Sequence, residues 1–292
     1  MAGDANYNSV SLLLHGNGSD GSTTVTDNSP SPKTVTAVGN ARIRTAQSKF
    51  GGSSLYCDGS GDYFSLTGVS FGTGVFTVEG WVYIVATGKT NALIDTRNAD
   101  MTTSGFVVYV RSTTNKLTVG TGNPFVATEG ATTVTTGWHH LALVRTGGNF
   151  YSYLDGVLEA TVANSATLSN TSWRIGNSWD ASANGEVYID DLRVTSGVAR
   201  YTSNFTPPAR AFPDGLGEVE GVVRDSAGAL CSRTVRAYRR DTGALAGSAV
   251  SDATTGAYRI GTPTLDEVSV IALDNATSGT YYNDQVIRVI PT

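Results

Sequence analysis

Cysteine is scarce in this sequence, because the 292 residues include only Cys57 and Cys231. The two are far apart in the chain, and each lies within or beside an apolar segment. Such a pair is more typical of buried free thiols than of a disulfide framework or a metal site. We therefore expect two free thiols, which is consistent with synthesis in a reducing compartment.

Charged residues are also few, at 15% of the chain, and they give a formal net charge of −5 with a pI near 5.2. Arg236, Arg239 and Arg240 form one short basic cluster, which is typical of a solvated strand face. Nucleic-acid binding uses a basic stripe or patch, and so does attraction to an anionic membrane. The composition therefore argues against both kinds of partner.

Long apolar runs are absent as well, and none approaches the roughly 20 residues that cross a bilayer as a helix. The N-terminal stretch MAGDANYNSVSLLL lacks the basic region, apolar region and cleavage site of a signal peptide. We expect neither membrane insertion nor a signal peptide. If the protein acts outside a cell, we expect its release by a route other than secretion.

Glycine is abundant instead, with 34 residues, and threonine, serine and asparagine are frequent. No run of alanine, glutamate, leucine and lysine has helical spacing, and short segments of alternating polarity are separated by polar turns. The sequence therefore predicts an all-β protein. Its length predicts one large and one small domain, which we place at residues 1–213 and 214–292.

The boundary follows from the segment that precedes it. Residues 187–194 alternate apolar and polar side chains, as a strand with one buried face does. The prolines Pro207, Pro208 and Pro213 then keep the following segment extended. Farther upstream, residues 138–145 and 150–154 predict two strands of a meander, in which Asp155-Gly156 supplies the positive φ angles of the next hairpin.

Six segments of the first domain carry family-like motifs: 49–63 (KFGGSSLYCDGSGDY), 76–83 (FTVEGWVY), 137–145 (GWHHLALVR), 153–156 (YLDG), 188–194 (YIDDLRV) and 197–208 (GVARYTSNFTPP). They resemble the concanavalin A-like, laminin-G-like jelly-roll domain of bacteriophage virion proteins. The resemblance covers roughly residues 7–213, so it is more specific than any single motif.

The sequence of the second domain predicts tighter strands, and three segments carry motifs: 221–229 (GVVRDSAGA), 235–243 (VRAYRRDTG) and 255–260 (TGAYRI). These segments resemble the carboxypeptidase-regulatory-like, transthyretin-like module, a small immunoglobulin-like (prealbumin-like) β-sandwich of seven strands. Such modules are usually spacers or attachment units.

These resemblances imply a bacteriophage virion protein assembled in the host cytoplasm. As a tail-fibre or other surface module it would bind host-surface glycans or another virion subunit. The alternative is a capsid or tail decoration protein with a purely structural role. Unpaired edge strands are compatible with a homo-oligomer, for example a trimer.

Glycoside hydrolases of this fold need two carboxylates across the scissile bond. The E-x-D-x-x-E strand of the laminarinase-like enzymes has no counterpart here, because Glu79 precedes Gly80-Trp81 and Glu186 precedes a hydrophobic strand. No G-x-S-x-G nucleophile elbow is present either. We therefore expect a binding protein and not an enzyme.

The loop 177–185 is the candidate saccharide site, because it combines an aromatic ring with amide and carboxylate groups. The candidate ligand-binding residues are Asn177, Trp179, Asp180 and Asn184. The alternative is an ordinary surface loop with a partly buried tryptophan. The other tryptophans, Trp81, Trp138 and Trp173, have strand-like contexts that favour the core.

The resemblance to laminin-G-like domains also implies a calcium site, since many such domains hold one Ca²⁺ with oxygen ligands. By position in the motif, Asp27 and Asp190 are the candidate ligands. Two alternatives stay open at this point. Asp27 also suits an Asx-turn, and Asp190 also suits a pairing with Arg193 or with an N-terminal backbone amide.

Overall fold

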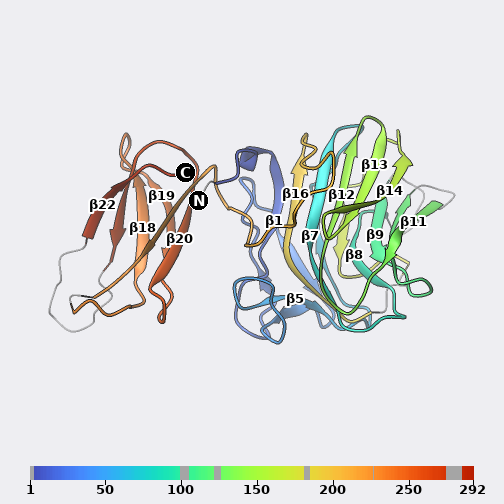
Figure 1. The fold of residues 1–292 in the computed structure, drawn as a ribbon, viewed down its shortest axis with the longest axis horizontal. Coiled ribbons are helices and arrows are strands. Elements are labelled where there is room, and N and C mark those ends of the chain that lie inside the picture. Colours follow the sequence, from blue (N-terminus) through green and yellow to red (C-terminus); the bar gives the residue numbers. More distant parts are fainter. Residues whose placement is uncertain (1–2, 99–104, 122–125, 181–184, 226, 274–284) are drawn as a thin grey trace. The chain divides into compact units, whose positions relative to one another are not determined.

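A computed structural model describes residues 3–98, 105–121, 126–180, 185–225, 227–273 and 285–292. The chain forms two compact units, one of residues Ser9–Phe212 and one that joins Met1–Asn8 to Pro213–Thr292 (Figure 1). The N-terminal residues thus cluster with the second unit, where the Gly3 N–H bonds the Thr292 carbonyl and the Asp4 N–H bonds the Gly215 carbonyl. No described helix is long and apolar enough to cross a membrane.

The first unit consists of two eight-stranded antiparallel sheets, drawn from blue to yellow in Figure 1. One 3-10 turn, η1 (Tyr7–Ser9), precedes the first strand. Across the first sheet the order is β14 (Val157–Ala163), β13 (Asn149–Leu154), β12 (Gly137–Thr146), β7 (Phe76–Ile84), β16 (Val187–Ser196), β5 (Ser54–Cys57) and β4 (Arg42–Arg44), with β1 (Val10–Leu14) also paired to β16.

The second sheet packs against the first. Its order is β11 (Val126–Thr133), β10 (Lys116–Thr121), β9 (Phe106–Val110), β8 (Asn91–Asp95), β15 (Trp173–Ile175), β6 (Tyr63–Leu66), β3 (Val35–Val38) and β2 (Thr24–Val25). Alternate residues of both sheets form one core, in which Val82, Ile84, Val108 and Val110 are at most 2% exposed. The all-β prediction and the jelly-roll sandwich are confirmed, and they follow from this alternation.

Several local predictions are confirmed by the strands. The meander β12-β13-β14 forms as expected, and Asp155 (φ 49°) and Gly156 (φ 81°) make its second turn. The strands on either side of Asp58-Gly59, β5 and β6, are not partners. β5 joins the first sheet and β6 the second, so the turn between them carries the chain across the sandwich.

The tryptophans and histidines divide between core and surface. Trp173 and Trp81 are buried as predicted, whereas Trp138 is half-buried on the outer face of the first sheet. His140 is fully buried and His139 is partly exposed, as expected for neighbours that point to opposite faces of a strand.

Both cysteines are free: Cys57 is buried and Cys231 half-buried. Burial also raises the pKa of the Cys57 thiol.

The segment that follows β16 returns over the outer face of the first sheet. Its Tyr201 and Phe205 rings stack at a centroid distance of 3.5 Å and pack on Tyr153 of β13. Beneath them Glu79 is fully buried, 2.7 Å from the Arg193 guanidinium, and it accepts a 2.6 Å hydrogen bond from the Tyr201 hydroxyl. The hydrogen bond from Tyr201 to this buried carboxylate thus fastens the exit segment to the sheet.

The second unit contains six described strands in two sheets, whereas seven strands were predicted. Val219, Val235, Ile260 and Val270 are among the residues of its core. The sheets have the orders β17 (Gly217–Val222), β20 (Ala257–Thr262) and β19 (Leu245–Val250), β18 (Thr234–Arg239), β21 (Val268–Ala272), β22 (Gln285–Val289). The assignment to the immunoglobulin-like class stays a prediction.

Candidate functional site

The outer face of the second sheet carries a group of polar side chains over β8, β9 and β15. Phe106, Val108 and Val110 of β9 point into the core, so the alternating Val107 and Tyr109 point outward. The register then places Asp95 of β8 beside Val107 and beside Arg174 of β15. Antiparallel pairing thus gathers residues that are up to 79 positions apart in the sequence.

Asp95 is the centre of this group. Its carboxylate is fully buried and binds the Arg97 guanidinium through both oxygens, with an Nη2–Oδ2 distance of 2.6 Å. It also accepts hydrogen bonds from the backbone N–H groups of Arg97 and Trp179, each at 2.9 Å. Burial alone would lower the pKa of Arg97, but Asp95 and Asp180 raise it above its ordinary value. A fixed charged pair therefore forms the floor of the site.

The loop after β15 is held on this floor. The Arg97 Nη2 lies 3.4 Å from Oδ2 of Asp180, whose Oδ1 accepts a 2.7 Å hydrogen bond from the Ser178 hydroxyl. Because Asp95 accepts the Trp179 N–H, the loop is tied to β8 through both its backbone and a side chain. Two anchors of this kind fix where the Asp180 carboxylate lies.

Arg174 is enclosed between two aromatic rings at one side of the loop. Its guanidinium carbon lies 4.1 Å from the Tyr63 ring centroid and 4.0 Å from that of Trp179. Its Nη1 donates to the Ser178 carbonyl at 3.2 Å. One face of the Trp179 ring is therefore occupied by an arginine, which is a cation–π contact and not a free stacking platform.

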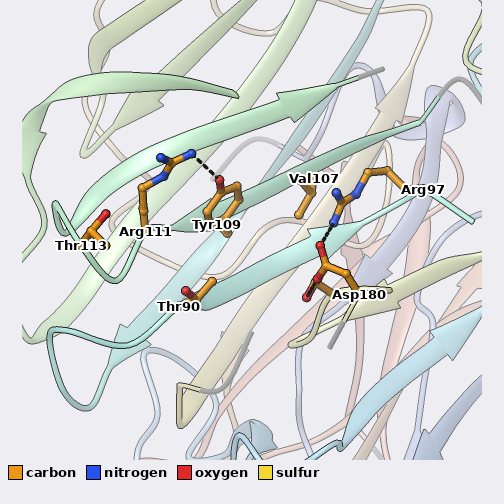
Figure 2. Close-up of a pocket in the computed structure, with 8 residues that line it drawn as sticks. Thr90, Arg97, Val107, Tyr109, Arg111, Thr113 and Asp180 are labelled. Carbon is orange, nitrogen blue, oxygen red and sulfur yellow. Dashed lines mark hydrogen bonds and ion pairs between the residues drawn. The ribbon is translucent and has the colours of Figure 1, made fainter. Parts of the chain in front are cut away.

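A cavity of about 240 Å³ opens beside the loop (Figure 2). Figure 2 shows Arg97 and Asp180 on one side of it and Tyr109 with Arg111 on the other. Arg111 lies 3.0 Å from Glu129 and donates to the Tyr109 hydroxyl at 3.2 Å; this hydrogen bond, opposed by desolvation, raises the Arg111 pKa. The lining residues are Thr90, Arg97, Val107, Tyr109, Arg111, Thr113, Ser178 and Asp180.

The four residues predicted for saccharide binding have different positions. Asp180 lines the cavity, and Trp179 covers Arg174 next to it. Asn177 is only 2% exposed and turns inward, where its amide donates to the Asp62 carbonyl and its oxygen accepts the Ser178 N–H. Asn184 lies outside the described residues. The loop thus contributes to a cavity, but Asn177 shapes the loop from inside.

Sequence reasoning missed the part of the cavity that β9 and the end of β8 supply. The segment FVVYVR at 106–111 alternates large apolar side chains with Val107, Tyr109 and Arg111. Its polar outward face was the one signal in the sequence. The pairing with residues near 178 depends on the sheet order, which that segment does not reveal.

The predicted calcium ligands are both buried among backbone donors. Asp27 accepts hydrogen bonds from the N–H groups of Leu13, Ser29 and Lys33 and from the Ser29 hydroxyl. This is the Asx-turn alternative. A carboxylate ringed by N–H donors does not fit a cation, which needs several oxygen ligands. Within the described residues no three His, Cys, Asp or Glu side chains form a metal-binding group. A calcium site in this fold stays a prediction.

Asp190 has the second of the alternatives expected for it. Its Oδ2 accepts the N–H groups of Lys49 and Phe50 at 2.7 and 3.0 Å, whereas Arg193 pairs with Glu79. The pairing of Asp190 with Arg193 is therefore not formed. Burial raises the pKa of Asp190 to about 7, and the Asp191 carboxylate adds to the rise, against the lowering effect of the two N–H donors.

This raised pKa predicts a pH-dependent stability. A carboxyl whose folded pKa exceeds its unfolded value stabilises the fold below the unfolded value, and the contribution is lost as pH rises through about 7. We expect Asp190→Asn to match the wild type near pH 4 and to have the higher melting temperature at pH 8. Tryptophan fluorescence measures this, with the exposed Asp20→Asn as control. A wild-type advantage at pH 8 would contradict it.

The comparisons with known proteins agree with the geometry of the fold. Residues 58–200 match the family model described as the concanavalin A-like lectin/glucanases superfamily. Domain 4 of the arabinanase AbnA from Geobacillus stearothermophilus, solved in complex with arabinotriose, is similar at 19% identity, a TM-score of 0.51, and coverage of 64% of this chain and 92% of that one.

A second solved structure covers more of the chain. The binding domain of Paraclostridial Mosquitocidal Protein 1 is similar at 11% identity with a TM-score of 0.50, over 97% of this chain and 76% of that one. Identities this low show the fold alone. No curated protein matches the sequence.

Proposed function

We propose that this chain, which contains a concanavalin A-like lectin/glucanase jelly-roll domain, binds a saccharide in the cavity beside Asp180. The observation that carries the proposal is the cavity itself. Its walls hold two arginines, a carboxylate and a tyrosine in fixed positions on the solvent-facing side of a rigid sheet. A site built on sheet strands holds its groups more accurately than one built from loops alone.

The chemistry of the lining suits sugar hydroxyls. Arg97, Arg111 and the hydroxyls of Thr90 and Thr113 are hydrogen-bond donors. The Ser178 hydroxyl donates to Asp180 and can accept, and Asp180 is an acceptor that binds a pair of neighbouring hydroxyls well. Tyr109 adds an aromatic surface for the apolar face of a sugar ring. At about 240 Å³ the cavity is below the roughly 300–1,000 Å³ of drug-sized ligand pockets, so it suits one or two sugar residues of a longer glycan.

Binding fits this site better than hydrolysis does. Glycoside hydrolysis uses two carboxylates that face each other across the bond. The described lining of the cavity contains a single carboxylate, that of Asp180. The nearby Asp95 and Glu129 are each paired with an arginine. We therefore propose recognition without chemistry.

We further propose that the protein is a bacteriophage virion component that binds host-surface glycans, with a decoration role as the alternative. The support is the resemblance of the segments 49–63, 76–83 and 188–194 to phage virion domains. Antibody labelling of purified particles distinguishes the two roles. Labelling at a tail or fibre end supports glycan recognition, and uniform labelling of the capsid supports decoration. Particles that lack the protein would exclude both.

A glycan array that includes bacterial surface polysaccharides tests saccharide binding, followed by calorimetry with the best ligand. We expect Arg111→Ala to weaken that binding at least about tenfold, because a charge-assisted hydrogen bond to a ligand contributes roughly 1.5–3 kcal/mol. The melting temperature changes little, since Arg111 is partly exposed and its ion pair is weak. Arg236→Ala, an equal loss of charge in the second unit, is the control. Equal affinities of Arg111→Ala and wild type would contradict the proposal.

A further inference from the structure

The outer face of the first sheet carries a row of aromatic side chains that the cavity does not use. The row crosses four adjacent strands at one level, because each residue is the direct register partner of the next: Trp138 with Tyr83, Tyr83 with Tyr188, and Tyr188 with Tyr56. Arg42 of β4 is the register partner of Tyr56 and ends the row. We call these five residues the aromatic row.

The aromatic row faces away from the core. The neighbours of Tyr83 along β7, Val82 and Ile84, belong to the core, and so do those of Tyr188 along β16. Side chains alternate along a strand, so both tyrosines point outward. Trp138, Tyr83 and Tyr56 are half-buried, and Tyr188 is 8% exposed. Three of the four rings are therefore accessible from the solvent, and the largely buried Tyr188 ring joins Tyr83 to Tyr56.

Ring contacts join the row from end to end. The centroid distances are 5.5 Å for Trp138–Tyr83, 6.0 Å for Tyr83–Tyr188 and 4.7 Å for Tyr188–Tyr56. Each spacing is close to the length of one pyranose residue. Successive rings are inclined by 47° to 89°, so the surface is twisted and not flat. A soluble polysaccharide whose successive residues are rotated relative to one another fits this surface better than the flat face of a crystalline polysaccharide does.

Polar groups accompany the rings at the β4 end. The Arg42 and Arg44 guanidinium groups lie 5.6 and 5.7 Å from the Tyr56 ring centroid, and the Tyr56 hydroxyl donates to Glu186 at 2.9 Å. Arg44 pairs with Asp20 at 3.3 Å, whereas Arg42 has no ion pair within the part of the chain that the structure describes. The row is thus nearly neutral but well supplied with donors and acceptors.

We propose that the aromatic row is a second saccharide-binding surface, and that it takes a soluble, uncharged, linear polysaccharide lying across the strands. Aromatic rings spaced by about one sugar residue contact the apolar faces of successive sugars. Arg42, Glu186 and the tyrosine hydroxyls bond the equatorial hydroxyls beside them.

The shape of the surface favours a polymer chain over a protein partner. The row is one residue wide, because at the next level Trp81 is covered by Lys49, 3.7 Å from its ring centroid, and by Phe50. A stable protein interface buries a broad patch of about 800 Å² on each partner. A narrow strip of four rings across four strands, with Arg42 on a fifth, is the footprint of an extended chain. Tyrosine, tryptophan and arginine are also frequent in protein interfaces. The experiment must therefore also test whether the chain associates with a second copy.

The two surfaces lie on different sheets, the cavity on the second and the aromatic row on the first. They therefore occupy opposite faces of the sandwich and bind independently. One domain then contacts two glycan chains, or two parts of a network, which raises the effective affinity without any new contact. The proposal does not depend on the function of the cavity.

Affinity gel electrophoresis of the full chain tests the proposal, with linear arabinan, xylan, mixed-linkage β-glucan and pullulan as soluble probes. We expect at least one probe to retard the wild type and Arg111→Ala equally. Trp138→Ala and Tyr56→Ala are expected to weaken this retardation about tenfold each, which corresponds to about 1.4 kcal/mol per aromatic contact. Arg42→Gln is expected to weaken it less and leaves all four rings in place.

Circular dichroism melting shows that each variant is folded, and Tyr151→Ala, an aromatic loss on a different part of the same sheet, is the matched control. Retardation that is unchanged in folded Trp138→Ala and Tyr56→Ala would overturn the proposal, and so would the absence of retardation by every probe. A wild type that is dimeric by light scattering and becomes monomeric in Tyr56→Ala would also overturn it, in favour of self-association. A loss of retardation only in Arg111→Ala would assign the binding to the cavity alone.

Discussion

Glu79→Gln is expected to lower the free energy of unfolding of the first unit by about 3–5 kcal/mol, the usual cost of breaking a buried ion pair. Glu79 is fully buried, and Arg193, 2.7 Å away, is almost fully buried too. The amide removes the negative charge, so the buried Arg193 guanidinium faces a neutral group in a site of low dielectric. Tyr201 exchanges a charged acceptor for a neutral one at the same time, so the attachment of the exit segment to the sheet is weakened.

Urea unfolding followed by tryptophan fluorescence measures this loss. All four tryptophans, Trp81, Trp138, Trp173 and Trp179, belong to the first unit, so the signal reports that unit without the second. Glu159→Gln is the control. Its carboxylate lies near the surface and accepts a hydrogen bond from the Thr132 N–H, so a change below about 1 kcal/mol is expected. A similar loss in both variants would refute the role of the buried pair.

The contribution of Glu79 to the free energy of unfolding also depends on pH and decreases in acid. Burial acts to raise its pKa, but Arg193, with His140 and Tyr201, lowers it to about 2. A lowered folded pKa gives stability that is present above the unfolded value, near pH 4.5, and is lost as pH falls toward 2. The difference between wild type and Glu79→Gln should therefore be largest above pH 5 and shrink in acid.

Asp95→Asn is expected to abolish saccharide binding in the cavity and to cost about 3 kcal/mol of stability. The substitution leaves the Arg97 guanidinium, which is 4% exposed, without its bidentate partner. It also weakens the acceptor for the Trp179 N–H, so the loop that carries Asp180 loses an anchor. Binding and stability fall together because the Asp95 carboxylate holds both the Arg97 guanidinium and the loop that carries Asp180.

The double variant Asp95→Asn/Arg97→Gln separates these two effects. It removes both charges, and a buried pair replaced by neutral groups is often tolerated. We expect it to regain most of the lost stability in urea unfolding but not the binding of the glycan identified on the array. Wild-type affinity in the single variant would show that Asp95 does not hold the site. A double variant as unstable as the single one would show that the unpaired charge is not the cause.

The candidate site shows how far sequence reasoning extends at a single loop. An aromatic residue among amides and carboxylates in 177–180 was a sound signal, and Asp180 does line a cavity. The same composition gave no means to separate Asn177, which turns inward to the Asp62 carbonyl, from Asp180, which does not. A side chain's direction in an irregular loop depends on partners that are distant in sequence.

Asp27 and Asp190 show the same limit for charged residues. Their positions in the motif are compatible with metal binding, but the geometry gives both of them backbone N–H donors. For Asp27 the donors at Ser29 and Lys33 are local, which made the Asx-turn foreseeable. For Asp190 the donors come from Lys49 and Phe50, about 140 positions away, and only the fold brings them there.

The sequence by itself determined the all-β class, the short strands and the turn at Asp155-Gly156, because side-chain alternation and backbone preferences are local properties. Tertiary structure decided which strands became neighbours. It placed β5 and β6 in different sheets, gathered Asp95, Arg97 and Asp180 around a cavity, and aligned Trp138, Tyr83, Tyr188 and Tyr56 in one row. These arrangements depend on sheet order and register, which are set by burial of the whole core and not by any one segment.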